Sequence, residues 1–468
     1  MPVALQAQTP SQDDTEDRLR DLESRQLQFE KLLEEKEARI RELEADTGPE
    51  DVSPPQSEAT SPAGSEKDAN PFGEFTPGQG FTVARTDFGE LQLSVYSYFR
   101  YLNQKGLDSQ YIDHFGNTQT IDQRHDFEVN KVFLYTKGWF LDPDFKYLFY
   151  VWSSNTALGK TSNNLVAGNL RYRFSDAFSL TGGVVGLPST RSMMGQFPYW
   201  HRVDTRLIAD EFMRGSFTQG ISADGKIARG LNYNLTVGNN LSNFGVDALK
   251  LDNSINTVSG ALVWMPTTGE FGPRASIGDF EHHQSLATLF SLHATFSTED
   301  KQSQPGQDDP ENTQIRLSDG VTVFTPDALA PGVSVNKVDY KMFALSAAMK
   351  YRGYALEGEL FYRELDNFRT NAPLGIDKLT DKGMQIKAST MLMPRTLQLY
   401  ANGSKIFGEY GDPWDAGVGI NYWPFKRRGL RVNSEALYLN KSPVGYASLP
   451  YTVGANGWVF VTNLELAF

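Results

Sequence analysis

Apolar and polar residues alternate along the chain from about residue 88 almost to its end, in segments of roughly ten residues separated by turns. Alternation with a period of two predicts β-strands that have one apolar face and one polar face. The final segment shows the pattern most clearly, because its apolar residues share a face: Trp458, Phe460, Leu464, Leu466 and Phe468. Residues 88–468 are therefore predicted to be all-β.

The connections between these segments alternate in length. Short turns follow Leu141, Phe174, Ile227, Tyr351 and Met393, and medium turns lie near 266–274 and 425–429. Longer loops are expected at about 104–125, 156–164, 187–214, 241–254, 299–338, 366–381 and 442–456, with a brief one at 407–412. Seven turns at one end and eight loops at the other require sixteen strands. We predict a 16-stranded antiparallel transmembrane β-barrel with a water-filled lumen, and a soluble β-sandwich is the alternative.

The first 87 residues are organised differently. Residues 15–46 repeat apolar residues at heptad spacing, which predicts a coiled coil or, alternatively, a single charged helix. Residues 47–87 are predicted to be a disordered linker, because Pro, Ser and acidic residues dominate its first part. Residues 1–14 are expected to be a disordered tail or the remnant of a signal peptide.

Composition narrows the class of function. The chain has no Cys, which excludes a disulfide-stapled module, a thiol enzyme and a Cys-ligated metal site. Mean hydropathy is −0.42 and there is no run of 18 apolar residues, which excludes a transmembrane helix. Most of the net charge of −13 comes from residues 1–71, which contain 18 acidic and 8 basic residues. The remainder is nearly neutral, so nucleic acid is not an expected partner.

Five stretches stand out across the barrel region: FLDPDFKYLFYV (140–151), LRYRFSDAFSLTGG (170–183), LIADEFMRGSFTQGI (207–221), KYRGYALEGELFYRE (350–364) and TNLELAF (462–468). In this order they resemble the phosphate-selective porin O and P family of Gram-negative outer membranes. The resemblance implies a sixteen-stranded porin, usually trimeric, whose third loop folds into the lumen. It implies contact with outer-membrane lipid, a coiled coil in the periplasm, and passage of small hydrophilic or anionic solutes without a cofactor.

The chain ends on the aromatic residue Phe468. Many outer-membrane barrels end in this way, and the terminal aromatic strand is their signal to the barrel-assembly machinery. Phe468 is accordingly the predicted membrane-assembly signal of this chain.

Two features depart from the phosphate-specific members of that family. Adjacent arginines are common on the family's second strand, where this chain has Asn130 and Lys131. Lys131 has the strand parity of Phe133 and Tyr135, which predicts that it faces outward or into a subunit interface. Loop 299–338 carries seven acidic residues against three basic ones, where the phosphate-specific members are rich in lysine. These departures argue against phosphate specificity, and the expected weak preference is for phosphate or other anions.

Strand parity also predicts which charges face the lumen. The basic members are Arg100, Lys146, Arg171, Arg173, Lys226, Lys350, Arg363, Lys387 and Arg431. The acidic members are Glu90, Asp224, Glu357, Glu359, Asp415, Glu435 and Glu465. Nine basic residues against seven acidic ones predict that the lumen is weakly selective for anions. Alternatively, these charges serve only to keep the lumen wet.

Loop 187–214 is the candidate pore constriction, because long loops in a compact fold are usually functional. Its charged residues are Arg191, Arg202, Arg206 and Arg214 against Asp204, Asp210 and Glu211. Arg191, Arg202 and Arg206 are the best candidates for an opening that favours anions. Alternatively, they pair with the three carboxylates of the same loop and leave little electric field.

Metal sites are weaker hypotheses. His282 and His283 could bind a metal ion, but adjacent side chains on an extended chain point apart. Glu357 and Glu359 share a strand face and could hold Ca²⁺, although pairing with basic lumen residues is the simpler prediction. No metal site and no cofactor are therefore expected.

Two other functions are alternatives to a porin. An outer-membrane enzyme would need a nucleophile and a base in contact. Ser291 and His293 share a face, but partners two residues apart are predicted to stand too far apart for that bond. The other alternative is a tether between the outer membrane and the cell wall through the coiled coil. A porin without enzymatic activity is the function that the sequence predicts best.

Overall fold

The computed structural model describes residues 31, 75–76, 80–154, 163–241, 254–302, 315–445 and 449–468. The tail predicted over 1–14, most of the coiled coil over 15–46 and the first part of the linker lie outside the described residues, so they stay predictions. In the described ranges no helix has the length and apolar character needed to cross a membrane.

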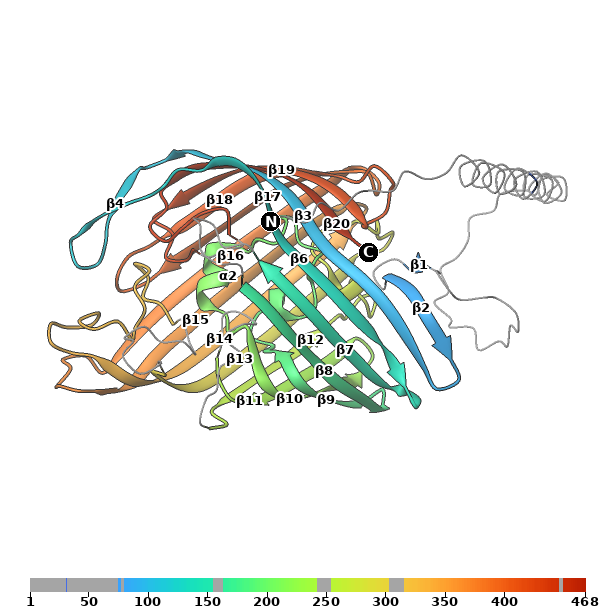
Figure 1. Cartoon of the computed structure of the whole chain (residues 1–468), viewed down its shortest axis with the longest axis horizontal. Coiled ribbons are helices and arrows are strands. Elements are labelled where there is room, and N and C mark those ends of the chain that lie inside the picture. The colour runs from blue at the N-terminus through green and yellow to red at the C-terminus, as the bar shows by residue number, and fades with distance from the viewer. Residues whose placement is uncertain are drawn as a thin grey trace, which may run out of the picture. The chain divides into compact units, whose positions relative to one another are not determined.

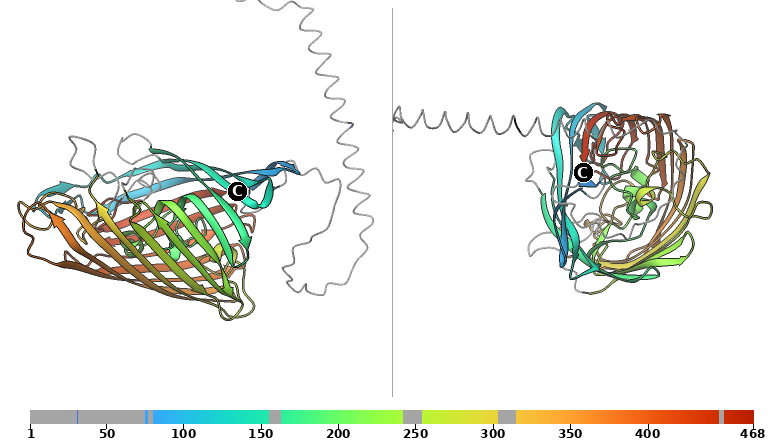
Figure 2. Two further views of the ribbon diagram at one scale, coloured as in Figure 1. Left: turned by 90° about the horizontal axis from the view of Figure 1, so that it is seen from below. Right: turned by 90° about the vertical axis from the view of Figure 1, so that its right-hand side faces the viewer.

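Sixteen strands in the described part of the chain form one closed antiparallel barrel (Figure 1, Figure 2). They are β3 (Gly89–Leu107), β6 (His125–Phe140), β7 (Asp142–Ser154), β8 (Asn163–Ser175), β9 (Phe178–Gly186), β10 (Phe217–Ala228), β11 (Leu231–Gly238), β12 (Thr257–Trp264), β13 (Ala287–Asp300), β14 (Val335–Tyr351), β15 (Tyr354–Thr370), β16 (Lys378–Met393), β17 (Leu397–Phe407), β18 (Trp414–Tyr422), β19 (Leu430–Asn440) and β20 (Gly457–Ala467). Each pairs with the next, and β20 pairs with β3 to close the ring, so no edge strand is left open. The predicted sixteen-stranded barrel is confirmed.

The strands alternate between a buried inner face and an exposed outer face. Along β20 the inner residues Val459, Val461 and Glu465 are buried, whereas Trp458 and Phe460 each remain 46% exposed. The same alternation runs along β14 to β19. The outer face of the barrel is therefore an apolar band, and the polar side chains point into the lumen.

The chain joins the sheet before the predicted boundary at residue 88. A short strand β1 (Phe75–Thr76) pairs with β2 (Gly80–Thr86), and β2 forms a hairpin with the start of β3. The linker predicted over 47–87 is therefore wrong in its last part, where alternating residues such as Phe81 find a partner on β3. At the other end of the chain, Val95 and Phe468 exchange two backbone hydrogen bonds, of 2.7 Å and 3.0 Å.

A β-bulge at Asn130 on β6 reverses which side chains of that strand point into the lumen and which point outward. Tyr98 on β3 lies opposite Lys131, whereas the next residue, Phe99, lies opposite Val129. The extra residue turns Lys131 into the lumen, where it is buried and pairs with Asp204 at 2.5 Å. The predicted outward orientation of Lys131 is wrong, because the parity count assumed an uninterrupted strand.

Three loops fold inward and fill part of the lumen. Loop 3, which we define as residues 187–216, carries a short helix α2 (Ile208–Met213) that contacts β15 to β18, and it lies inside the ring of strands (Figure 2). A hydrophobic core forms there from loop 3, from the loop after β13 and from the loop before β20, with buried residues such as Leu187, Ile208, Phe212, Ile315, Leu317, Phe324, Leu449 and Tyr451. A small hairpin of β4 (Gln110–Ile112) and β5 (Thr118–Thr120) extends the first loop. The filled half of the lumen lies against β14 to β20.

The bulge gives a prediction about folding. Deleting Asn130 should leave Lys131 in the lumen, because Val129 and Lys131 would then alternate without interruption opposite Phe99 and Tyr98. Its pair with Asp204 should persist, so the thermal midpoint of the barrel should change little. Lys131→Met leaves Asp204 without its cation, which costs about 3–5 kcal/mol and should lower the midpoint clearly. A deletion that lowers the midpoint as much as Lys131→Met would contradict this role of the bulge.

Candidate pore and its lining

Loop 3 is anchored to the far wall of the barrel by buried ion pairs. Arg202 contacts Asp415 on β18 at 2.8 Å and Glu435 on β19 at 2.6 Å. Arg191 contacts Glu357 on β15 at 2.9 Å. All five side chains are almost fully buried, so each charge depends on its partner for compensation. These contacts hold the loop across the lumen.

Backbone carbonyls of loop 3 are also held by strand side chains. Arg431 donates to the carbonyl of Trp200 at 2.6 Å and pairs with Glu465 at 2.6 Å. Arg100 donates to the carbonyl of Val203 at 3.2 Å, and Arg363 donates to that of Phe212 at 3.3 Å. The predicted lumen arginines therefore serve as clamps for the loop.

The remaining charges of loop 3 form a second group on its other side. Arg214 pairs with Glu211 at 2.6 Å, and Arg206 lies 3.7 Å from the same carboxylate and 4.2 Å above the ring of Trp200. Asp210 accepts a hydrogen bond from Thr190 at 2.9 Å. Although burial opposes it, the two arginines hold the pKa of Glu211 below its ordinary value. Burial and Arg214 lower the pKa of Arg206 to about 10, which leaves it charged at neutral pH.

The seven charged residues predicted for the constriction thus lie together in the lumen, but most of them are paired. Arg191 and Arg202 are neutralised by wall carboxylates, and Arg214 by Glu211. Asp204 is held by Lys131 and accepts a hydrogen bond from Tyr98 at 3.2 Å. Sequence reasoning considered pairing within the loop only, whereas the structure adds partners from four distant strands.

The predicted lumen charges divide into covered and open members. Loop 3 and its neighbours bury Arg100, Lys350, Arg363, Lys387, Arg431, Glu357 and Glu359. The other four basic members stay accessible: Lys146, Arg171, Arg173 and Lys226. Arg171 pairs with Asp224 at 2.5 Å and Arg173 with Asp144 at 2.7 Å. Strand parity predicted which charged residues lie on the inner face of the barrel. Burial then removes most of these charges from contact with the water in the lumen.

The turn between β12 and β13 also folds into the lumen. The sequence predicted a medium turn at 266–274, but residues 265–286 form one long connection, which we call the inserted turn. Lys350 donates to the carbonyl of Phe271 at 2.7 Å, and Arg191 donates to that of Ala275 at 2.8 Å. The amide of Ile277 reaches the carbonyl of Tyr199 at 3.3 Å. The inserted turn is therefore attached to both the wall and loop 3.

Arg274 sits at the tip of the inserted turn in a strained backbone conformation. Its φ angle is +51° and that of Ala275 is +50°, in the left-handed region that residues with a Cβ rarely adopt. Such residues cost roughly 1–3 kcal/mol each and persist where surrounding contacts fix them. The side chain of Arg274 is exposed, and it donates to the carbonyl of Phe197 in loop 3 at 3.0 Å. Sequence reasoning missed Arg274, because its place in the lumen depends on the fold of the turn.

Two adjoining cavities run along the open side of the lumen. The turn-end cavity, of about 690 Å³, is lined by residues including Glu90, Lys137, Trp139, Lys146 and Tyr199. The loop-end cavity, of about 400 Å³, is lined by residues including Lys131, Phe133, Tyr150, Trp152, Arg206 and Arg214. Four residues line both cavities and form what we call the neck: Tyr135, Leu148, Phe197 and Arg274. The free volume therefore lies between loop 3 and the wall made by β6 to β9.

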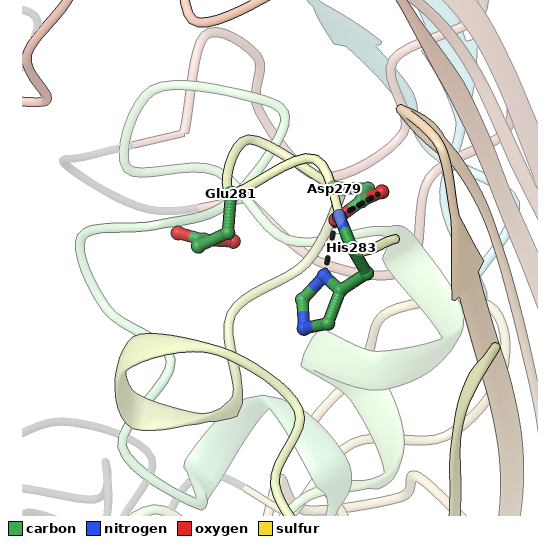
Figure 3. A group of neighbouring side chains, drawn as sticks. All are labelled: Asp279, Glu281 and His283. Atoms are coloured by element: carbon green, nitrogen blue, oxygen red, sulfur yellow. Dashed lines mark hydrogen bonds and ion pairs between the residues drawn. The ribbon is translucent and has the colours of Figure 1, made fainter. Parts of the chain in front are cut away.

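A cluster of possible metal ligands lies on the inserted turn. Asp279, Glu281 and His283 bring ligand atoms within 4.8 Å of one another. Figure 3 shows that Asp279 contacts His283, whereas Glu281 lies apart, and Glu281 pairs with Arg428 at 2.8 Å. The amide of Gly353 donates to the other oxygen of Asp279 at 2.7 Å. Because these carboxylates already have partners, the cluster attaches the inserted turn to the next turn of the barrel.

The contact between Ser291 and His293 corrects another expectation. His293 Nε2 lies 2.8 Å from the Ser291 hydroxyl, so the prediction that they stand too far apart is wrong. An imidazole that leans along the strand spans the gap between neighbours on one face. His293 Nδ1 contacts the carbonyl of Pro188, and both side chains are buried beneath loop 3. The pair therefore fixes the start of loop 3 and has no access to the cavities described above.

The chain is similar to solved structures of bacterial outer-membrane channels at low identity. An anion-selective porin from Comamonas acidovorans shares 12% identity over 81% of this chain and 100% of that chain, with a TM-score of 0.48. The outer membrane channel DcaP of Acinetobacter baumannii shares 9% identity over 83% and 99% of the two chains, with a TM-score of 0.49. OmpT, an outer membrane protein of Vibrio cholerae in its trimer form, shares 12% identity over 82% of this chain and 100% of that chain, with a TM-score of 0.47.

Comparison by sequence finds no counterpart for the chain. No protein-family model matches it, and no curated protein matches it.

The anchor at Arg202 gives a prediction about loop 3. Arg202→Met should leave Asp415 and Glu435 buried without a cation, which costs about 3–5 kcal/mol and releases the loop from the wall. Thermal unfolding should show a lower midpoint. The triple variant Arg202→Met, Asp415→Asn, Glu435→Gln removes all the charges together and should recover much of the lost stability. A triple variant as unstable as the single one would contradict the ion-pair anchor.

The Asp279–His283 contact gives a pH prediction. The hydrogen bond to Asp279 raises the pKa of His283, and against burial the hydrogen bonds from His283 and Gly353 lower the pKa of Asp279. A raised histidine pKa adds stability that is full below about 6.5 and is lost as the pH rises through the raised value. The loss of stability in His283→Gln should therefore be larger at pH 6 than at pH 9, by about 1 kcal/mol. A difference that is constant or grows with pH would contradict this assignment.

Proposed function

We propose that this chain is an outer-membrane porin of a Gram-negative bacterium, which lets small hydrophilic solutes diffuse passively and weakly prefers anions. The observation that carries the proposal is the pair of adjoining cavities inside a closed barrel with an apolar outer band. An apolar outer face beside a polar lumen is the arrangement that a lipid bilayer requires of a barrel. The aqueous route would run from the loop end to the turn end along β6 to β9.

Loop 3 is the proposed constriction. It occupies the half of the lumen next to β14 to β20, so the route narrows to the strip between the loop and the opposite wall. Among the predicted constriction residues, four line this strip: Arg206 and Arg214 with Asp204 and Glu211. Arg191 and Arg202 would act as anchors that set its width and not as contacts of the solute.

The proposed anion preference rests on the balance of charges along the cavities. Lys131, Arg206, Arg214 and Arg274 line the loop-end cavity against Asp204 and Glu211. Lys137, Lys146 and Arg274 line the turn-end cavity against Glu90, whose carboxylate pairs with Arg85 at 2.8 Å. Charges beside a narrow, low-dielectric route act more strongly than they do in bulk water, so this small excess favours anions.

Assembly follows from the same proposal. The outer band would contact outer-membrane lipid, and Phe468 would be the signal read by the barrel-assembly machinery. A homotrimer is proposed, with the exposed outer pair Phe99 and Phe127, whose rings stack at 5.4 Å, as a candidate contact between subunits. The coiled coil predicted over 15–46 would lie in the periplasm and support the trimer.

We propose that the chain shares the architecture of the phosphate-selective porin O and P family. Phosphate specificity is not proposed, because Lys131 on the second strand is bound to Asp204. The tether alternative depends on residues 15–46, which lie outside the described residues except for Lys31. The enzyme alternative gains nothing from Ser291 and His293, which loop 3 covers.

The porin proposal predicts a measurable channel. The purified full chain in a planar bilayer should conduct, and its reversal potential across a KCl gradient should show modest anion preference. Lys146→Gln removes an accessible cation of the turn-end cavity and should shift the reversal potential toward cation selectivity, because the local excess of positive charge falls. A wild-type channel that is cation-selective would contradict the anion preference but not the porin function. Absence of any channel would contradict the porin function.

A further inference from the structure

We propose that the neck between the two cavities is a binding site for small organic anions that carry a flat, unsaturated or aromatic face. The inference rests on the proposed porin function and deepens it, because it names the class of solute. The site consists of Arg274 from the inserted turn, Phe197 from loop 3 and Tyr135 from β6. A carboxylate would bind Arg274, and the flat part of the solute would lie against the two rings.

Arg274 is an available cation in the neck, the part of the route whose lining both cavities share. Its side chain is exposed, and its contact with the carbonyl of Phe197 uses one guanidinium nitrogen. Among the described residues no carboxylate lies within ion-pair distance of Arg274, in contrast to Arg191, Arg202 and Arg214. A planar guanidinium with free donors matches the geometry of a carboxylate.

The position of Arg274 is fixed before a solute arrives. Arg274 and Ala275 both have left-handed φ angles, and hydrogen bonds hold carbonyls on both sides of Arg274. Lys350 holds the carbonyl of Phe271, and Arg191 holds that of Ala275. Strained residues held in this way are concentrated at functional sites, and a preorganised group loses little freedom on binding.

The wall opposite loop 3 supplies an aromatic surface. Tyr135 stacks on Phe133 with ring centroids 5.5 Å apart and planes 1° apart, and Phe133 stacks on Trp152 at 5.8 Å. Phe197 packs against Phe133 at 5.7 Å from the side of loop 3. A hydrated inorganic anion gains nothing from these rings, whereas a flat organic anion gains contact area. The combination therefore favours organic carboxylates over phosphate.

The test uses benzoate as the probe, with acetate and inorganic phosphate as comparisons at equal ionic strength. Single-channel recordings of the full chain should show that benzoate reduces the chloride current at a half-blocking concentration about tenfold below that of acetate. Arg274→Gln should raise the half-blocking concentration of benzoate about tenfold, since a charge-assisted contact is lost. Arg274→Lys should give an intermediate value, because it keeps the charge and loses the planar fork.

The controls separate the site from general effects of charge and folding. Arg395→Gln removes an exposed arginine from the short turn between β16 and β17, at the same end of the barrel as the inserted turn, and should leave block by benzoate unchanged. Tyr135→Leu keeps every charge and should raise the half-blocking concentration of benzoate about threefold while leaving acetate unchanged. Each variant is compared only when its conductance in KCl shows a folded channel.

Three outcomes would overturn the inference. Equal block by benzoate and acetate would remove the role of the rings. Stronger block by phosphate than by benzoate would assign the route to inorganic anions. Equal block of the wild type and Arg274→Gln would remove Arg274 from the site. In each case a conducting, anion-preferring channel would leave the porin proposal standing, whereas a chain that forms no channel would contradict that proposal itself.

Discussion

Buried ion pairs hold loop 3 across the lumen, and Arg202 makes two of them, with Asp415 and Glu435 on the far wall of the barrel. The three side chains are buried, so none of their charges is satisfied unless the others stay in place. With the loop held there, its helix packs against β15 to β18 and the hydrophobic core fills that half of the lumen. The free volume is left along β6 to β9.

The inserted turn completes the route from the opposite end. It meets loop 3 through the contacts of Ile277 with Tyr199 and of Arg274 with Phe197. Its base is held by the hydrogen-bonded Asp279 and His283, and its tip by Lys350. Two segments that are far apart in the sequence thus share one boundary of the neck. A change in either segment would alter the neck that both cavities share.

The electrostatics of the lumen follow from which charges these segments cover. Most inner arginines, such as Arg363 with Asp381 at 2.6 Å, are compensated and hold the structure together. A few cations, above all Arg274 and Lys146, remain on the surface of the cavities. Buried pairs fix geometry at little net charge, whereas the accessible cations act on a passing solute. The proposed selectivity therefore depends on a small minority of the charged residues.

The sequence by itself determined the barrel. A period of two, turns and loops of alternating length, and sixteen segments are local properties, and backbone pairing with neighbours in sequence makes them sufficient. Strand parity also placed Arg100, Lys350 and Glu357 on the inner face of the barrel, where they are buried. Parity failed at Lys131, because one extra residue in a strand is invisible to a count of alternation.

Only the tertiary structure decided what the inner charges do. Pairs such as Arg191 with Glu357, or the contact between Arg274 and Phe197, join residues far apart in the chain, and no spacing encodes them. The length and inward fold of residues 265–286 were likewise missed, since an irregular connection has no periodic signature. Local patterns fix strands because their hydrogen bonds are local, whereas the route through the lumen depends on where two irregular segments meet the wall.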